Sequence, residues 1–404
     1  MKIRIFTLLL LIPLFTFCEK SGGNGNENGN GGDNGNGQGQ VDPVDPDAEL
    51  PPEIKDGETV LVTNANVENF LTKVTYPERN YTETHIRDDE FAPTSPGKDD
   101  FAPKFTIRWE ADPSAGAPVC HLWEDDGWSR NFVDSYIDDH YVTISSLRPN
   151  ANYHYEVKAG EKVLTSGSFR TTGHLHQLRF SALRNVRDLG GWKTKDGSKT
   201  VKYRMIYRGG RFQSPELNSR GRGDLIAEGI KAQLDLRGHT SSGTQEYLNI
   251  EQSPLYGNVE DFNFLAPCIE EGYVQMLRDD QDKCKQCMQF IMKCVRENKP
   301  VYFHCSLGRD RTGTLAMMIL GILGVNEGDI SKEYELTQFA PNGYSVSSGE
   351  KTTMTRRVDY KGAANYIWGF TGENGSFADA MQAYLLSIGI TQTEIDEFRS
   401  LMLE

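Results

Sequence analysis

Hydrophobic and polar positions along the chain follow four successive patterns. Ile5–Phe17 is one apolar run, and the following stretch, Ser21–Gln40, consists mostly of glycine and asparagine. Between about Val60 and Thr172, short segments alternate apolar and polar residues, which is typical of half-buried strands. Farther on, Val301–Phe303 has the pattern of a buried strand and Leu315–Leu323 that of an apolar helix. The chain therefore combines an apolar leader, a segment unable to form a core, a β-rich module and a region with both helices and strands.

The N-terminus has the layout of a secretory signal over residues 1–18. A basic start precedes Ile5–Phe17, which is too short to span a membrane, and the run ends at Cys18. This resembles a bacterial lipoprotein signal, in which the cysteine becomes the lipidated first residue. Phe15 and Phe17 stand where such signals usually have leucine and a small residue, so a plain signal peptide with a chance cysteine is the alternative.

Residues 19–55 are expected to form a flexible linker, because a stretch rich in Gly, Asn and Pro cannot bury apolar surface. A tether of this kind is useful directly after a lipid. We therefore expect a protein attached to the bacterial cell envelope through Cys18, periplasmic or surface-exposed. No apolar run reaches the roughly 18 residues of a membrane-spanning helix.

Residues 56–172 are expected to form an all-β sandwich. Leu147–Tyr153 joins two strands through a turn containing proline, which resembles the tyrosine corner of fibronectin type III domains, with Trp109 as a core candidate. Such a module is expected to act as a spacer, substrate platform or adhesive surface. Asp99, Asp100, Asp125 and Asp126 are either cation ligands or solvated turn residues. Strands are expected at Phe105–Trp109, Tyr141–Ile144, Tyr153–Val157 and Ser168–Thr171.

Composition narrows the classes of function. The formal net charge is −14 and the pI about 5.2, which argues against nucleic acid or an anionic membrane surface as the main partner. Seven cysteines in 404 residues are too few for a disulfide scaffold. Because their number is odd, at least one cysteine is expected to do something other than pair.

The most informative segment is His304–Gly313, with the sequence His-Cys-Ser-Leu-Gly-Arg-Asp-Arg-Thr-Gly. Five residues between Cys305 and Arg311 let the backbone curl, so that several N–H groups point at one phosphate, and the following helix adds its positive end. The same donors stabilise a thiolate, which makes Cys305 a nucleophile. The alternative is a buried structural cysteine beside an arginine at a helix start.

The whole string resembles the signature loop of the cysteine-dependent protein tyrosine phosphatase superfamily. Arg311 is suited to hold two phosphoryl oxygens, and Thr312 to donate its hydroxyl to the cysteine sulfur. Gly308 allows the backbone angles of the cradle, and His304 is expected to order the loop. The resemblance implies phosphomonoester hydrolysis through a cysteinyl-phosphate, without metal or cofactor.

Arg309 and Asp310 indicate the subfamily, bacterial phosphatases that carry Gly-Lys-Asp-Arg-Thr-Gly, with arginine here in place of lysine. In that family the aspartate inside the loop is the proposed general acid, so the resemblance implies this role for Asp310. The chain contains no Trp-Pro-Asp sequence, the usual acid loop of the eukaryotic tyrosine phosphatases. The rival acids are Asp261 and Asp235, and Asp310 could instead only pair with Arg309. A second cation at position 309 also suits phosphoinositides, although arginine and lysine hydrogen-bond differently.

Other segments extend the resemblance over residues 180–404. Asn185–Gly191 and Tyr207–Gly210 resemble the N-terminal signature of this family, and Ala383–Leu403 resembles its C-terminal helices. The implied fold is an α/β domain with a central, mostly parallel sheet flanked by helices. Leu234–Arg237 would then end a strand at the ligand-binding edge. The substrate-binding residues implied are Ser306, Leu307, Gly308, Arg309, Arg237, Asp235 and Arg208.

Two features leave alternatives open. Nine basic and two acidic side chains lie between Arg184 and Arg211, forming either a solvated hairpin or a rim that attracts anionic phosphoesters. Cys284, Cys287 and Cys294 share one face of a predicted helix, which suits core packing better than zinc. A reversible disulfide between Cys305 and a neighbouring cysteine is a further hypothesis.

The predicted protein is thus a lipid-anchored phosphatase with a fibronectin-like module before its catalytic domain. Its expected substrates are phosphorylated proteins, which would make it a tyrosine or dual-specificity phosphatase. One alternative is a phosphoinositide or inositol-phosphate phosphatase acting on lipid or small-molecule phosphoesters. The other is an inert phosphate-binding or adhesive surface protein, which the intact Cys305, Arg311 and Thr312 argue against.

Overall fold

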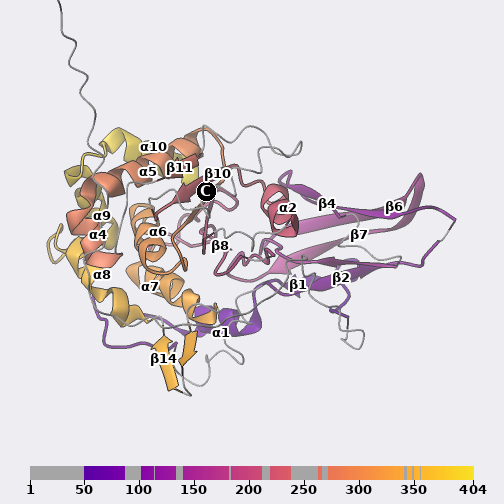
Figure 1. The fold of residues 1–404 in the computed structure, drawn as a ribbon, viewed down its shortest axis with the longest axis horizontal. Coiled ribbons are helices and arrows are strands. Elements are labelled where there is room, and N and C mark those ends of the chain that lie inside the picture. Colours follow the sequence, from indigo (N-terminus) through magenta and orange to yellow (C-terminus); the bar gives the residue numbers. More distant parts are fainter. Residues whose placement is uncertain are drawn as a thin grey trace, which may run out of the picture. The chain divides into compact units, whose positions relative to one another are not determined.

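The computed structural model describes residues 50–86, 102–112, 114–132, 140–181, 183–211, 219–237, 263–265, 272–340, 344–347, 350–354 and 356–404. These residues form a group of β-strands and an α/β domain (Figure 1). The N-terminal unit, Met1–Val44, lies outside them. The predicted signal, the lipidated Cys18 and most of the linker therefore stay predictions.

The β-rich module consists of two sheets. Four strands of the larger sheet pair antiparallel, and β1 (Thr59–Leu61) joins its edge parallel to β7 (Lys162–Thr172). The smaller sheet pairs β2 (Phe105–Arg108) with β5 (Tyr141–Ile144). The remaining strands of the larger sheet are β6 (Asn152–Ala159), β3 (Pro118–Glu124) and β4 (Ser129–Phe132). Each of the four strands expected from the sequence is present.

The module has a core of its own. Trp109 and Tyr153 are buried in it, together with apolar residues from both sheets. The Tyr153 hydroxyl accepts a hydrogen bond from the Arg148 backbone N–H at 2.8 Å and donates one to Glu124. The turn before β6 is therefore tied to that strand by the tyrosine, as its sequence indicates.

One helical segment departs from the predicted sandwich. After β1 the chain forms α1 (Ala65–Lys73), which begins at an Asn64 side chain that accepts from two backbone N–H groups. Val67, Phe70 and Leu71 of α1 pack with Leu336 and Phe339 of the α/β domain, and α1 lies beside α7 in Figure 1. The alternating pattern of the surrounding strands did not indicate this helix.

The α/β domain is built on a five-stranded sheet in the order β11-β10-β12-β9-β8. The first four strands are parallel and β8 (Arg187–Asp188) is antiparallel, which confirms a central, mostly parallel sheet. The parallel strands are β11 (Asn263–Leu265), β10 (Ala232–Asp235), β12 (Val301–His304) and β9 (Ile206–Gly209).

Helices surround this sheet. The central one, α6 (Asp310–Ile322), is buried from Thr312 to Ile322 because its sequence is apolar on all sides. Ser376 and Thr391 form capping boxes at the starts of α9 and α10. The other helices are α2 (Ser219–Ala227), α4 (Tyr273–Asp279), α5 (Gln281–Arg296), α7 (Glu327–Glu335), α8 (Lys361–Trp368), α9 (Phe377–Ser387) and α10 (Gln392–Met402). Among the described residues, no helix combines the length and apolar character needed to cross a membrane.

Small elements complete the domain. The hairpin of β13 (Tyr344–Ser347) and β14 (Glu350–Met354) is antiparallel. Two short 3₁₀ helices, Leu336–Phe339 and Arg357–Tyr360, precede β13 and α8 respectively.

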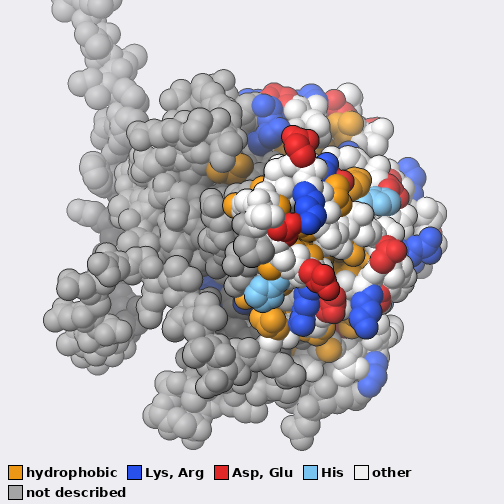
Figure 2. Space-filling view, turned by 90° about the vertical axis from the view of Figure 1, so that its right-hand side faces the viewer, with side chains coloured by type: hydrophobic (Ala, Val, Ile, Leu, Met, Phe, Trp, Pro, Cys, Tyr) orange, Lys and Arg blue, Asp and Glu red, His pale blue; other side chains and the backbone are white. Residues whose placement is uncertain are grey.

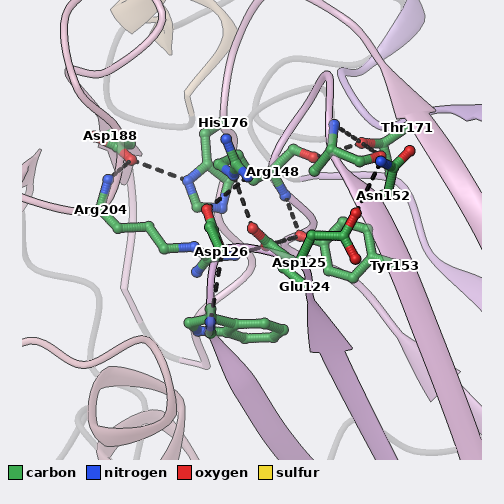
Figure 3. Close-up of polar contacts among 12 residues, drawn as sticks. Glu124, Asp125, Asp126, Arg148, Asn152, Tyr153, Thr171, His176, Asp188 and Arg204 are labelled. Carbon is green, nitrogen blue, oxygen red and sulfur yellow. Dashed lines mark hydrogen bonds and ion pairs between the residues drawn. The ribbon is translucent and has the colours of Figure 1, made fainter. Parts of the chain in front are cut away.

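A buried network of charges joins the β-rich module to the α/β domain (Figure 3). Arg204, which precedes β9, donates hydrogen bonds to Glu124 of β3 and to Glu228. Arg148 also donates to Glu124, at 2.8 Å. Because the two carboxylates are almost wholly buried and each has an arginine partner, this contact is specific in geometry.

A buried histidine, His176, also connects the β-rich module with the α/β domain. His176 is wholly buried, and its Nδ1 lies 3.1 Å from a carboxylate oxygen of Asp188. Its Nε2 lies 3.1 Å from the backbone oxygen of Ser146 in the β-rich module. Asp188 also accepts from the backbone N–H groups of Gly190 and Arg204, so one aspartate organises the turn before β9.

The face of the molecule on the side of the β-rich module carries intermixed acidic and basic side chains (Figure 2). Asp125 and Asp126 are hydrogen-bonded, to Asn152 and Arg148 respectively. Asp99 and Asp100 lie outside the described residues. Asp125 and Asp126 lie in the turn between β3 and β4. Among the described residues, no group of three or more potential metal ligands is present.

Candidate active site

The signature loop begins where β12 ends. His304 is the last residue of this strand, Cys305 follows it, and α6 starts at Asp310. The neighbouring strands β9 and β10 are parallel to β12 and end in register with it, since His304 pairs with Gly209 and Asp235. The loop therefore lies at the carboxyl edge of the sheet, where ligands bind in open α/β folds.

The curl of the loop depends on Gly308. Its φ is +71°, and a Cβ at this position would lie 2.4 Å from the backbone oxygen of Gly209. Any other residue would meet both the left-handed backbone and this contact. Gly209 is constrained in turn, because a Cβ there would lie 2.1 Å from the Tyr302 hydroxyl. The glycines of the two motifs thus pack against each other.

Two side chains hold the loop from behind. The Asn185 amide donates to the backbone oxygen of Gly308 at 2.9 Å, and the Arg208 guanidinium donates to the same oxygen at 2.5 Å. Because the carbonyl of Gly308 is held inward, the N–H groups of the loop are available to face an anion. The sequence predicts Arg208 to bind substrate, but its side chain is wholly buried and positions the loop instead.

Glu333 of α7 is the counter-ion of two buried arginines, Arg208 and Arg187. Its carboxylate accepts from Arg208 at 2.6 Å and from Arg187 at 2.7 Å. All three side chains are almost wholly buried. Burial, followed by the charge of Arg187, lowers the pKa of Arg208 to about 10, although Glu333 opposes this shift. With a pKa of about 10, Arg208 remains charged at neutral pH.

Cys305 has the environment of a nucleophile. The residue is 3% exposed, and burial by itself raises the pKa of its thiol. The hydroxyl of Thr312, the charge of Arg311 and the backbone N–H groups of Thr312 and Gly308 together outweigh burial, so the pKa is lowered. Stabilisation of the thiolate by these donors is what the loop sequence predicts.

Thr312 acts on the ionisation of Cys305. Its hydroxyl is buried, has no other hydrogen-bond partner among the described residues, and contributes to the lowered pKa of the Cys305 thiol. Arg311, one residue earlier on α6, is close enough for its charge to act on both Cys305 and His304. Both residues therefore lie where the sequence places them.

His304 has a supporting position. It is wholly buried, its Nδ1 donates to the Cys305 backbone oxygen at 3.0 Å, and its Nε2 accepts from the Gln233 amide at 2.8 Å. Burial lowers the pKa of His304, although the nearby Asp235 opposes this. A neutral imidazole with both nitrogens engaged orders the loop, as predicted.

Asp310, the predicted general acid, lies at the first residue of α6. Its Oδ1 accepts from Arg309 Nε at 2.9 Å and from the Tyr273 hydroxyl at 2.5 Å. The side chain is 32% exposed, so a substrate in the loop can reach it. The salt bridge with Arg309 therefore exists, but it occupies only one of the two carboxylate oxygens.

Asp235 and Arg237 interact mainly with each other. Arg237 donates to both oxygens of Asp235, at 3.0 Å and 2.7 Å, and both residues are buried at the end of β10. Burial alone raises the pKa of Asp235, but His304 and Arg237 outweigh it and the pKa is lowered. An aspartate held ionised in this way is a poor proton donor. The other rival acid, Asp261, lies outside the described residues.

The mouth of the loop is formed by Ser306 and Leu307. Arg211 donates its backbone N–H to the Ser306 oxygen at 3.1 Å, and its guanidinium lies 3.4 Å from the Ser306 hydroxyl. Leu307 is 38% exposed, so its apolar side chain is accessible. Both residues lie in the loop between Cys305 and Arg311, and their predicted role in substrate binding stays a prediction.

The comparison with known proteins agrees with this geometry. The profile of the tyrosine phosphatase family matches residues 178–404. The chain belongs to the tyrosine phosphatase family. The matched region contains the whole α/β domain described above, including the sheet, the loop and the C-terminal helices.

Two curated tyrosine phosphatases are similar to part of the chain. A tyrosine-protein phosphatase of Nostoc commune is 29% identical over 142 residues, which is 32% of this chain and 48% of that protein. A protein of Cupriavidus necator whose name describes it as a tyrosine-protein phosphatase is 25% identical over 173 residues. This match covers 39% of this chain and 62% of that protein. The chain thus spans between about half and three fifths of these relatives.

One solved structure is also similar to part of the chain. It is the PTP-2 phosphatase of Cydia pomonella, with 14% identity and a TM-score of 0.25. The match covers 37% of this chain and 94% of that one.

The basic segment between Arg184 and Arg211 divides into two groups. Its four lysines are exposed, as a solvated hairpin requires, whereas three of its arginines are internal. Arg187, Arg204 and Arg208 form ion pairs with Glu333, Glu124 and Glu228 and contribute little to the surface. Lys195 pairs with Glu78 at 2.7 Å. The density of arginines therefore reflects the internal support of the phosphatase loop and the contact with the β-rich module.

The other described cysteines of this tyrosine phosphatase family member are structural. Cys120, Cys284, Cys287 and Cys294 are free and buried, and burial raises the pKa of the Cys284 thiol to about 12. The three helical cysteines face the core from α5, as their spacing predicts. A disulfide of Cys305 stays a prediction, because all five described cysteines are free here.

Sequence reasoning missed two residues of the site, Glu333 and Tyr273. Neither lies in a recognisable motif, and each reaches the loop from a separate helix. The available signal for Glu333 was indirect, since two buried arginines in the N-terminal signature require an acidic partner. For Tyr273 no signal was present in the sequence.

Proposed function

We propose that the protein is a protein tyrosine phosphatase that works through a cysteinyl-phosphate intermediate. The observation that carries this proposal is the geometry of the loop: buried Cys305 follows β12, Gly308 makes the left-handed turn, and α6 begins at Asp310. The lowered pKa of Cys305, caused by Thr312, Arg311 and loop N–H groups, agrees with it. Membership of the tyrosine phosphatase family supports it. A cysteine that only packs in a core does not need donors that stabilise its thiolate. A cysteine that attacks phosphorus does, because the thiolate is the nucleophile.

In the first step the Cys305 thiolate attacks phosphorus, and the bond from phosphorus to the ester oxygen breaks. The leaving oxygen takes a proton from Asp310, which becomes a carboxylate. Arg311 holds two phosphoryl oxygens throughout, and the loop N–H groups bind the charge that develops on the equatorial oxygens. The products of this step are a free alcohol or phenol and the cysteinyl-phosphate.

In the second step water attacks the phosphorus of the intermediate and gives a proton to the Asp310 carboxylate. The bond between sulfur and phosphorus breaks, and inorganic phosphate leaves. The Thr312 hydroxyl donates to the departing sulfur, which makes Cys305 a better leaving group. The enzyme returns to its initial protonation state, with no metal or cofactor taking part.

The preferred substrates are aryl phosphates of the phosphotyrosine type. A phosphoinositide phosphatase needs a second cation for additional phosphates, and Arg309 is the only extra cation within the loop sequence. In this chain the guanidinium of Arg309 is hydrogen-bonded to Asp310 at 2.9 Å. Arg309 is therefore engaged with the carboxyl group of Asp310 and is less available for additional phosphates, whereas Leu307 offers an apolar contact at the mouth.

A phosphate-release panel tests this function. Purified protein is assayed on phosphotyrosine, phosphoserine and phosphothreonine peptides, on phosphoinositides in micelles and on soluble inositol phosphates. We expect vanadate-sensitive release that is at least about tenfold faster for phosphotyrosine peptides than for the other substrates. Release mainly from phosphoinositides would assign the alternative substrate class. No release from any substrate would overturn the enzymatic proposal.

The N-terminal region is proposed to attach this activity to the bacterial cell envelope, through a lipid on Cys18 and a Gly/Asn-rich tether. The β-rich module is proposed to be a fibronectin type III-like spacer, supported by its two sheets and by the Tyr153 contact. We expect the full-length protein expressed with its signal to partition into detergent, and Cys18→Ser to move it to the aqueous phase. Equal partitioning of both proteins would contradict the anchor.

A further inference from the structure

The predicted general acid is contacted by a chain of hydroxyl groups from two other helices. The Tyr334 hydroxyl, on α7, lies in hydrogen-bond contact with the hydroxyl of Tyr273, the first residue of α4. The Tyr273 hydroxyl in turn donates to Asp310 Oδ1 at 2.5 Å. A carboxylate accepts and a hydroxyl has one proton to give, so the direction of donation runs from Tyr334 through Tyr273 to Asp310.

The position of Tyr273 is set by its backbone. Its φ is +59°, in the left-handed region that a bulky residue rarely adopts. The preceding Gly272 packs so tightly that a Cβ there would lie 2.7 Å from the backbone carbon of Asp310. The Tyr273 N–H donates to the Thr314 hydroxyl at 2.8 Å, and that hydroxyl donates to the Asp310 backbone oxygen at 2.9 Å.

Such a conformation persists only where several contacts require it, and strained residues of this kind gather at functional sites. Here the strain brings one hydroxyl to one oxygen of the predicted acid. Oδ1 of Asp310 accepts from both Tyr273 and Arg309, and none of the described residues donates a hydrogen bond to Oδ2. The two donors therefore fix the rotation of the carboxyl group and leave Oδ2 for proton transfer.

We infer that Tyr273 is a positioning residue that orients Asp310 for proton transfer to the leaving oxygen, with Tyr334 holding Tyr273 in place. This inference rests on the proposed phosphatase function. Proton transfer needs the acid within hydrogen-bond reach of the leaving oxygen, so a carboxyl group free to rotate would be a less efficient donor. The Tyr273 hydroxyl should therefore increase the rate only for substrates whose leaving group requires a proton.

The test is Tyr273→Phe, which removes one hydroxyl and retains the ring and backbone. We expect kcat for phenyl phosphate, a poor leaving group, to fall roughly 5- to 50-fold, since general acid catalysis as a whole contributes about 10²- to 10⁴-fold. For 4-nitrophenyl phosphate, whose leaving group needs little protonation, kcat should change less than about twofold. KM should stay the same for both substrates.

A double variant separates positioning from a general structural effect. In the Asp310→Asn background, Tyr273→Phe should cause no further loss on phenyl phosphate, because the group it orients is already absent. Tyr334→Phe, which removes only the outer hydroxyl, should show the same leaving-group pattern with a smaller loss. The matched control is Tyr366→Phe on α8, whose hydroxyl accepts from the Gln281 amide at 3.4 Å; its kcat values should equal those of wild type.

The outcomes distinguish this inference from the proposed function. If wild type has no phosphatase turnover, the proposed function fails and the positioning role fails with it. If wild type is active but Tyr273→Phe slows both aryl phosphates equally, or slows neither, the positioning role alone is wrong. Additive losses in the double variant would also overturn it, because they would show that Tyr273 acts independently of Asp310.

Discussion

Replacement of Cys305 by serine is expected to abolish turnover of phosphotyrosine peptides and aryl phosphates while the protein stays folded. Removing the nucleophile of a covalent mechanism costs about five to six orders of magnitude in kcat. A serine hydroxyl is not ionised by the donors that lower the pKa of the Cys305 thiol. The measurement is initial-rate kinetics on 4-nitrophenyl phosphate, with thermal unfolding recorded alongside.

The matched control is Cys120→Ser in the β-rich module. Cys120 is also buried, but burial raises the pKa of its thiol to about 12, and it lies in a separate core. We expect this variant to retain the wild-type kcat. If Cys305→Ser kept more than about one hundredth of the wild-type rate, the cysteinyl-phosphate mechanism would be refuted.

The ionisation of Cys305 can be followed through the pH dependence of its alkylation, which inactivates the protein. The pKa of Cys305 is lowered, so its thiolate is the main form above that pKa and is lost as the pH falls through it. Inactivation by iodoacetate should therefore reach its plateau at a lower pH than for an ordinary cysteine, and slow down as the pH falls through the pKa of Cys305. Inorganic phosphate, which competes for the loop, should protect the enzyme.

Replacement of Glu333 by glutamine is expected to destabilise the whole α/β domain. Glu333 is the only acidic residue in contact with Arg187 and Arg208 among the ion pairs of the described residues, and all three are almost wholly buried. Breaking a buried pair while its partner stays charged costs about 3–5 kcal/mol of unfolding free energy. Urea-induced unfolding followed by circular dichroism measures this loss.

Activity should fall with stability in this variant, because Arg208 also holds the Gly308 carbonyl. At temperatures where the variant is still folded, we expect a lower kcat and weaker protection by phosphate. The control is Glu397→Gln, which breaks an exposed pair with Arg296 whose side chains are 46% and 40% accessible. Its unfolding midpoint should match wild type, since exposed pairs contribute little. Equal midpoints for Glu333→Gln and wild type would contradict the supporting role of Glu333.

Part of the site could be predicted because its requirements lie in consecutive residues. Cys305, Gly308, Arg311 and Thr312 belong to one loop, and the backbone geometry of an anion cradle restricts both their types and their spacing. The strand before the loop and the helix after it followed from apolar patterns alone. The mostly parallel sheet and the family were implied by the same short segments, and both are confirmed.

The role of Arg208 could not be predicted in this way. In the sequence it is an arginine beside two glycines in a basic segment, which suited an anion-binding rim. In the structure its partner is Glu333, 125 residues farther along the chain. Whether an arginine faces solvent or a buried carboxylate depends on which helix covers it, and local patterns carry no information about this.

The helix α1 shows the same limit for the fold. Its sequence has an Asn cap and three buried apolar residues, but it lies inside a region of alternating strands. Its apolar face is covered by Leu336 and Phe339 from the opposite end of the chain. A nine-residue helix is marginal by itself, so its existence depends on this packing.

The sequence by itself determined the chemistry of the phosphatase loop, because the conformation of that loop is set by neighbouring residues within one turn of chain. The tertiary structure alone decided which charges are internal and how the Asp310 carboxyl group is held. Glu333 and Tyr273 act on the loop from α7 and α4, and only packing brings these helices to it. Interactions between distant segments depend on the complete fold, and the energetic cost of burying a charge makes those interactions specific.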